Sequence, residues 1–278
     1  MPMPWSILRR GVTVAAVAVG AIVAIAQGTV GSSSSAYLSA GEAVSSGHLP
    51  TIAGVERLLG GADQEAGIAV TWCHRPTVFA AAQVRAAAVD AVIDAGRIDL
   101  VRPALDGLQR AARRLIDCSP GDGFGWAWLG YVADERGASD DEVRSLFSRS
   151  LWTAPSERGV VTLRLKTAAA IRSRRGAVLD DVLRADLRTV LSQTDEVHIA
   201  AQIVGPIYQW VEPLAQAEFS RLDDGPERSM LITQFGQWRA NIASCDARRF
   251  NDWQYRGMRG SCEGDDRIPD FDWKRPTN

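Results

Sequence analysis

Lysine is almost absent from this chain. It occurs only at Lys166 and Lys274, so arginine carries nearly all of the positive charge. The 31 basic residues are balanced by 33 acidic ones, which leaves a formal net charge of −2. Because nucleic acid attracts proteins through an excess of basic side chains, the sequence predicts no nucleic-acid partner.

Histidine is also scarce, and the cysteines are not clustered. His48, His74 and His198 lie far apart, and no C-x-x-C or C-x-x-C-H motif is present. A metal site needs several ligands that converge, while redox and covalent haem sites need closely spaced cysteines. The sequence therefore predicts no metal and no cofactor.

Strand patterns are missing as well. No stretch alternates apolar and polar residues long enough to form a β-strand. Apolar residues recur instead at three- and four-residue spacings, which is the period of an amphipathic helix. We therefore expect an all-α fold, and 278 residues suffice for a body with a large core.

The N-terminus carries an export signal. Two arginines precede an apolar run from Gly11 to Ala26, and residues 1–30 are interpreted as a signal peptide or signal-anchor helix. The arginines place the N-terminus in the cytoplasm and the body in the periplasm, at a bacterial inner membrane. An Ala-x-Ala motif ends at Ala26, so a soluble periplasmic protein cleaved there is the alternative.

The four cysteines predict disulfides, because their number is even and the body is expected outside the cytoplasm. Three pairings are open, and Cys73–Cys118 with Cys245–Cys262 is favoured because it keeps both bridges local. The second bridge would close a loop of about 16 residues and stabilise it by roughly 3 kcal/mol. It would hold an irregular C-terminal tail at residues 244–278.

The most informative stretch is a pair of short helices between residues 123 and 155. Its characteristic positions are Trp126, Leu129, Gly130, Val143, Phe147, Ser150 and Pro155. The first three form a W-x-x-L-G motif, and the pattern resembles a tetratricopeptide repeat in degenerate form. Ala133 stands where the family has tyrosine. Since one hairpin cannot bury its apolar face alone, neighbours of the same kind are expected.

The resemblance implies antiparallel helical hairpins stacked as a short solenoid over residues 63–243, preceded by the N-terminal apolar helix. A weaker hairpin with similar spacing spans residues 77–118, and a further helical pair follows at 157–192. Residues 31–62 are interpreted as a flexible Ser/Gly linker with a short helix.

Two tryptophans of the first helix are expected to face different surroundings. Trp126 occupies a core position of the repeat. Trp128 lies roughly 160–200° around the helix from it, so we expect Trp128 to meet a neighbouring repeat or solvent.

The groove-lining positions of the family correspond here to Phe124, Ala127, Tyr131, Asp134 and Glu135. This set is aromatic at one end and acidic at the other, which implies an extended partner peptide of basic character. The leading hypothesis is a non-enzymatic, membrane-tethered scaffold that binds a protein partner. The resemblance places such proteins in envelope systems such as polysaccharide synthesis or export.

An exported glycan-binding protein or glycan-active enzyme is the alternative. Its acid–base residues would come from Asp140, Asp141, Glu142, Asp180, Asp181, Asp223 and Asp224. Two carboxyl groups facing each other across a cleft would favour the enzyme. Arginine clusters at 110–114 and 172–175 would suit an anionic polysaccharide, although arginines near helix C-termini commonly compensate the helix dipole.

Overall fold

The structure is a computed structural model that describes residues 37–45, 50–59, 73–192, 200, 203–222, 229–230, 232–233 and 236. In chain order its elements are α3 (Arg75–Asp94), α4 (Ile98–Cys118), α5 (Gly123–Glu135), α6 (Asp140–Thr153), α7 (Arg158–Arg175), the 3-10 turn η1 (Ala177–Leu179), α8 (Asp180–Leu191), the 3-10 turn η3 (Gly205–Ile207) and α10 (Tyr208–Phe219). Residues 37–45 and 52–59 are helical too. No strand occurs among the described residues, and the all-α prediction is confirmed.

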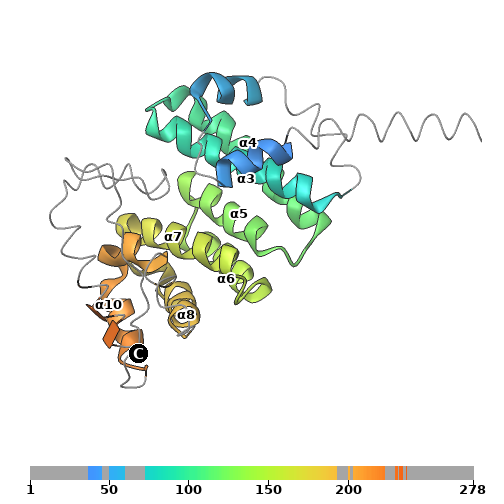
Figure 1. The fold of residues 1–278 in the computed structure, drawn as a ribbon. Helices are drawn as coiled ribbons and strands as arrows, with labels where there is room; N and C mark the ends of the chain where they lie inside the picture. The colour runs from blue at the N-terminus through green and yellow to red at the C-terminus, as the bar shows by residue number, and fades with distance from the viewer. Residues whose placement is uncertain are drawn as a thin grey trace, which may run out of the picture.

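Helices that follow each other in the sequence pack side by side (Figure 1). Short turns join α3 to α4 and α5 to α6. After α7, the 3-10 turn η1 continues directly into α8. Helix α10 packs against α7 and α8. Helix α5 contacts both α4 and α7 and so belongs to two cores. Its Trp128 and Val132 are buried with α3 and α4, whereas Ala133 is buried with residues of α6, α7 and α8.

Local sequence signals place the turns. Gly137, between α5 and α6, has φ +72°, and Gly176, after α7, has φ +72°. Residues with a side chain are strained in this left-handed region, so glycine is favoured at both points. Ser139 caps α6 by accepting a hydrogen bond from the backbone N–H of Glu142 at 3.2 Å.

The close packing of α5 against α6 depends on a glycine, Gly130. A Cβ atom on Gly130 would lie 2.5 Å from Cε2 of Phe147, so a larger residue would push the helices apart. The buried members of the repeat-like motif are Gly130, Val143, Phe147 and Ser150. Leu129 is only half-buried and Pro155 is exposed, so these two positions lie at the edge of the hairpin.

The two tryptophans of α5 lie in different surroundings. Trp128 is 5% exposed and packs on Phe79 of α3, so it meets the neighbouring hairpin. Trp126 is half-buried, with the guanidinium carbon of Arg149 5.0 Å from its ring centroid. The indole N–H of Trp126 donates to the carbonyl of Pro120 at 3.0 Å. Trp126 therefore lies at the outer edge of the hairpin, and Trp128 is part of the core.

A fully buried arginine links four helices. Arg164 of α7 donates through Nε and Nη2 to the carboxylate of Asp186 on α8, at 2.9 and 2.5 Å. Its Nη1 donates to the carbonyl oxygens of Ser150 and Ala154 at the end of α6, at 3.0 and 2.8 Å. The Ser150 hydroxyl donates at 2.7 Å to the carbonyl of Gly123, where α5 begins. Burial raises the pKa of Asp186 to about 6, and Arg164 opposes the shift.

Helix α3 is a core helix of the body. Among the described residues, only α3 has the length and hydropathy of a membrane span, and 67% of its apolar window is buried against the rest of the protein. The predicted membrane segment at residues 1–30 lies outside the described residues, as does the tail at 244–278 with Cys245 and Cys262.

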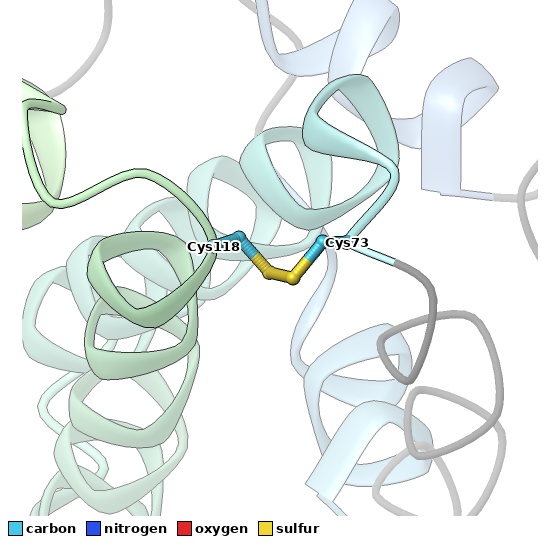
Figure 2. Close-up of a disulfide and its surroundings, with 2 residues drawn as sticks. All are labelled: Cys73 and Cys118. Carbon is cyan, nitrogen blue, oxygen red and sulfur yellow. A yellow bond between two sulfur atoms is a disulfide. The ribbon is translucent and has the colours of Figure 1, made fainter.

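A disulfide joins the two ends of the α3–α4 hairpin (Figure 2). Cys73 immediately precedes α3 and Cys118 is the last residue of α4, with 5.2 Å between their Cα atoms. This is the local pairing that the sequence analysis favours. The bridge spans 45 residues of chain and fixes the start of α3 beside the end of α4.

We expect Arg164→Met to lower the free energy of unfolding by about 3–5 kcal/mol, because the Asp186 carboxylate would remain buried without its counter-ion. Urea denaturation followed by circular dichroism measures the change. Arg184→Met on the exposed surface of α8 is a matched control, expected within about 0.5 kcal/mol of the parent. Equal losses for the two variants would contradict the bridging role of Arg164.

We expect the double variant Cys73→Ser, Cys118→Ser to lose about 4 kcal/mol of stability, since the chain entropy of a 45-residue loop returns to the unfolded state. Urea denaturation under non-reducing conditions measures the loss. A reductant should lower the stability of the parent protein by opening the Cys73–Cys118 bridge. The variant lacks this bridge and should show no such loss from it. Peptide mapping that recovers Cys73 and Cys118 in separate unbridged fragments would contradict this pairing.

Candidate functional site

A pocket of about 160 Å³ opens between α3, α5 and α7. Its lining consists of Ala86 and Asp90 from α3, Trp128 and Tyr131 from α5, and Leu163, Lys166, Thr167, Ala170 and Arg174 from α7. Alternate helices of the chain therefore converge on one site. Pockets for drug-sized ligands are generally about 300–1,000 Å³, so this pocket suits one side chain or a small chemical group.

Aromatic packing makes one wall of the pocket rigid. The ring of Trp128 lies 5.7 Å from that of Phe79 and 5.6 Å from that of Phe124, centroid to centroid. Phe79 and Phe124 meet edge to face at 4.9 Å. Tilted and edge-on arrangements are favourable for aromatic rings. Because its neighbours hold it on two sides, Trp128 presents a fixed apolar surface to the pocket.

The half-buried carboxyl group of Asp90 lies beside this wall. The Tyr131 hydroxyl donates to Oδ1 of Asp90 at 3.2 Å. Burial raises the pKa of Asp90 to about 8; the bond from Tyr131 lowers it, and the charges of Asp94 and Glu135 raise it. Asp90 is therefore largely a neutral carboxylic acid at pH 7. Strongly shifted groups in a pocket are candidates for functional sites.

The C-terminal end of α5 is covered by arginines of α7. Arg174 donates to the carboxylates of Asp134 and Glu135, the latter at 2.9 Å. Arg175 donates to Asp134 at 2.9 Å and to Asp140 at 2.6 Å. Burial raises the pKa of Glu135, while Arg174 lowers it and Asp134 raises it. The acidic end of α5 is thus neutralised from within the protein.

Lys166 brings a positive charge to the pocket from the middle of α7. The residue is half-buried, and burial lowers the pKa of its ammonium group. Within the described part of the chain, no residue forms an ion pair or hydrogen bond with this group. Removal of an ammonium from water without a counter-ion costs free energy, so Lys166 favours the approach of an anion.

The five predicted groove residues lie on one face of α5, but they do not form one open groove. Tyr131 lines the pocket. Phe124 belongs to the aromatic cluster, and Ala127 is buried with 1% exposure. Asp134 and Glu135 lie under the arginines of α7. Asp134 and Glu135, the acidic side chains expected to attract a basic peptide, are therefore already engaged in ion pairs within the protein.

Two charged pocket residues, Asp90 and Lys166, were not identified from the sequence, and Arg174 was considered only as a member of the basic cluster at 172–175. Asp90 and Arg174 lie on helices that lack the repeat-like motif. Lys166 had one available signal, because it is one of only two lysines in a chain that otherwise uses arginine. Nothing in the spacing of these residues indicates that they converge.

The acids proposed for glycan hydrolysis are not gathered at the pocket. Asp140 pairs with Arg175, Asp141 pairs with Arg144 at 2.9 Å, and Asp180 pairs with Arg172 at 2.7 Å. The described members of that set, which also include Glu142 and Asp181, do not line the pocket. Asp223 and Asp224 lie outside the described residues.

The basic cluster at 172–175 has internal partners. Arg172 bonds to Asp180 and donates to the carbonyl oxygen of Trp210 at 2.7 Å, which ties α7 to α10. Together with Arg174 and Arg175, it holds neighbouring helices. Of the cluster at 110–114, Arg113 is exposed on α4.

In the ranges that the structure describes, no three or more His, Cys, Asp and Glu side chains lie together as metal ligands. His74 instead lies at the start of α3, where its Nδ1 is 2.7 Å from the hydroxyl of Thr77.

Comparison with protein-family models, curated protein sequences and solved structures finds no match to this chain.

We expect Asp90→Asn to remove a pH dependence of stability. The pKa of Asp90 in the folded state, about 8, exceeds its ordinary value of 3.8. The folded state therefore retains a proton that the unfolded state loses, and stability falls as pH rises from about 4 to 8, by up to about 1.4 kcal/mol per pH unit. Urea denaturation at pH 5, 6.5 and 8 measures this slope.

Asp117→Asn, at an exposed position of α4, is the matched control and should keep the slope of the parent protein. If Asp90→Asn also kept that slope, Asp90 would be ionised in the folded protein and the assignment would be wrong.

Proposed function

We propose that this chain is a non-enzymatic scaffold protein that holds a segment of a protein partner in the pocket between α3, α5 and α7. The protein is tethered to the inner membrane of a bacterium through residues 1–30, with its helical body in the periplasm. Its hairpins form a short solenoid of the degenerate tetratricopeptide type, and its setting is envelope polysaccharide synthesis or export.

The observation that carries this proposal is the convergence of α3, α5 and α7 on one small pocket. Each of the three is the leading helix of a packed pair, so a partner segment crossing them would contact successive hairpins. The pocket has a rigid aromatic wall and a few polar groups, the composition typical of a recognition site. A single anchoring side chain in such a pocket commonly contributes much of the binding energy.

The Cys73–Cys118 bridge supports the location outside the cytoplasm, because disulfides persist in oxidising compartments. The orientation of residues 1–30 rests on the two arginines before the apolar run.

Site-specific crosslinking in native membranes tests the proposal. A photoreactive residue at Thr167, which lines the pocket, should capture a defined envelope protein. The same residue at Arg113, exposed on α4, a helix that contributes no residue to the pocket lining, is the matched control and should not capture it. The intact mass of the recovered protein shows whether Met1 is retained.

Two results would contradict the proposal. Identical capture from both positions would remove the pocket from the interaction. A protein that begins at Gln27 and is recovered alone would remove both the tether and the partner.

One observation favours the second candidate, a glycan-active enzyme. Asp90 is kept protonated near neutral pH in a pocket, as a general acid requires, and the charge of Glu135 acts on it. Loss of glycan hydrolysis in Asp90→Asn, with folding intact, would support this candidate over the scaffold.

A further inference from the structure

The charges around the pocket are unequally compensated. Arg174 and Arg175 are bound to Asp134, Glu135 and Asp140. Asp90 carries little negative charge at neutral pH, since burial holds its pKa near 8. The groups that would oppose an incoming anion are thus either neutral or already paired.

Lys166 is the remaining charge that faces the pocket. Its ammonium has no bonding partner among the residues that the structure describes, and it lies half-buried beside apolar side chains. A charge in such surroundings interacts more strongly with an opposite charge than it would in water. An anionic group that entered the pocket would therefore replace the lost solvation of Lys166.

The size and lining of the pocket restrict the anion. A volume of about 160 Å³ accommodates one side chain or a chain terminus. Trp128 and Leu163 provide apolar walls, which suit the methylene or backbone atoms that carry the charged group. Bidentate recognition of an oxyanion is typical of arginine, and Arg174 is already bonded to Asp134 and Glu135. The pocket therefore offers an incoming anion a single ammonium, whose one charge matches one carboxylate.

We propose that the pocket is a carboxylate-binding site in which Lys166 receives an acidic side chain or the C-terminal carboxylate of the partner segment. This inference rests on the proposed scaffold function and specifies the chemistry of the partner. It reverses the expectation from the α5 sequence, which pointed to a basic peptide. Tyr131 and Trp128 position the group that carries the carboxylate, and Lys166 provides the attraction.

The lysine content of the chain permits a direct test. Lys166 and Lys274 are its only lysines, so reductive methylation with ¹³C-formaldehyde gives two lysine signals and one from the N-terminal amine. Dimethylation preserves the positive charge. Lys274→Arg and Lys166→Arg assign the two lysine resonances in the full-length protein.

The probe is N-acetylglutamate, with neutral N-acetylglutamine as its matched control at constant ionic strength. We expect N-acetylglutamate to shift the Lys166 resonance saturably and to raise the pKa of Lys166 by about one unit or more, as an adjacent opposite charge does. The Lys274 resonance should not respond, and N-acetylglutamine should have no effect on either.

Three outcomes would overturn the inference: no response of Lys166, equal responses of Lys166 and Lys274, or a stronger response to inorganic phosphate than to the carboxylate. The last would reassign the pocket to phosphate. Crosslinking from Thr167 provides the comparison with function. Capture of a partner without a carboxylate response would leave the scaffold function standing and reject the site.

A carboxylate response without a captured partner would leave the carboxylate site standing and reject the scaffold function. When both succeed, Lys166→Met should reduce partner capture at least tenfold, and Arg113→Met, which removes one exposed positive charge from α4, should leave it unchanged.

Discussion

The buried guanidinium of Arg164 is the contact on which the arrangement of the central helices depends. It binds the carboxylate of Asp186 and the last carbonyls of α6, and Ser150 extends the network to the start of α5. The charge of Arg164 is satisfied only when the Asp186 carboxylate of α8 and the carbonyl oxygens of Ser150 and Ala154 at the end of α6 are in place. Misplacement of any one would leave a charged or polar group buried without a partner, which proteins rarely tolerate. The network therefore selects one relative position for these helices.

The position of α7 in turn creates the pocket. Once Arg164 is directed into the core, Leu163, Lys166 and Ala170 reach the pocket beside it, and Arg174 reaches the acidic end of α5. The same helix thus closes one part of the α5 face and leaves another accessible. Its arginines neutralise Asp134 and Glu135, whereas Lys166 stays without a partner in the described part of the chain. Side chains that hold the helices together and side chains that line the pocket thus lie on neighbouring turns of one helix.

Much of the local structure could be predicted from the sequence because it depends on neighbours in the chain. The all-α class follows from apolar spacing, and the turn near Gly137 and Ser139 follows from backbone preference and capping. The pairing of Cys73 with Cys118 agrees with the preference for a local bridge. The pocket was less accessible to such reasoning. Tyr131, one of the predicted groove residues, lines the pocket. Asp90 lies 41 residues before Tyr131, on α3, and Lys166 lies later in the chain, on α7.

By itself, the sequence determined the helices, their turns and the hairpin between residues 123 and 155, because three- and four-residue spacings and caps act within one segment. The tertiary structure alone decided which charges remain available. Asp134 and Glu135 appear open when α5 is considered in isolation, and Arg174 neutralises them only because α7 packs across them. Burial likewise makes Asp90 a neutral acid and leaves Lys166 as the charge that faces the pocket. Solvation and ion pairing depend on residues distant in sequence, so the character of the site follows from packing rather than from any motif.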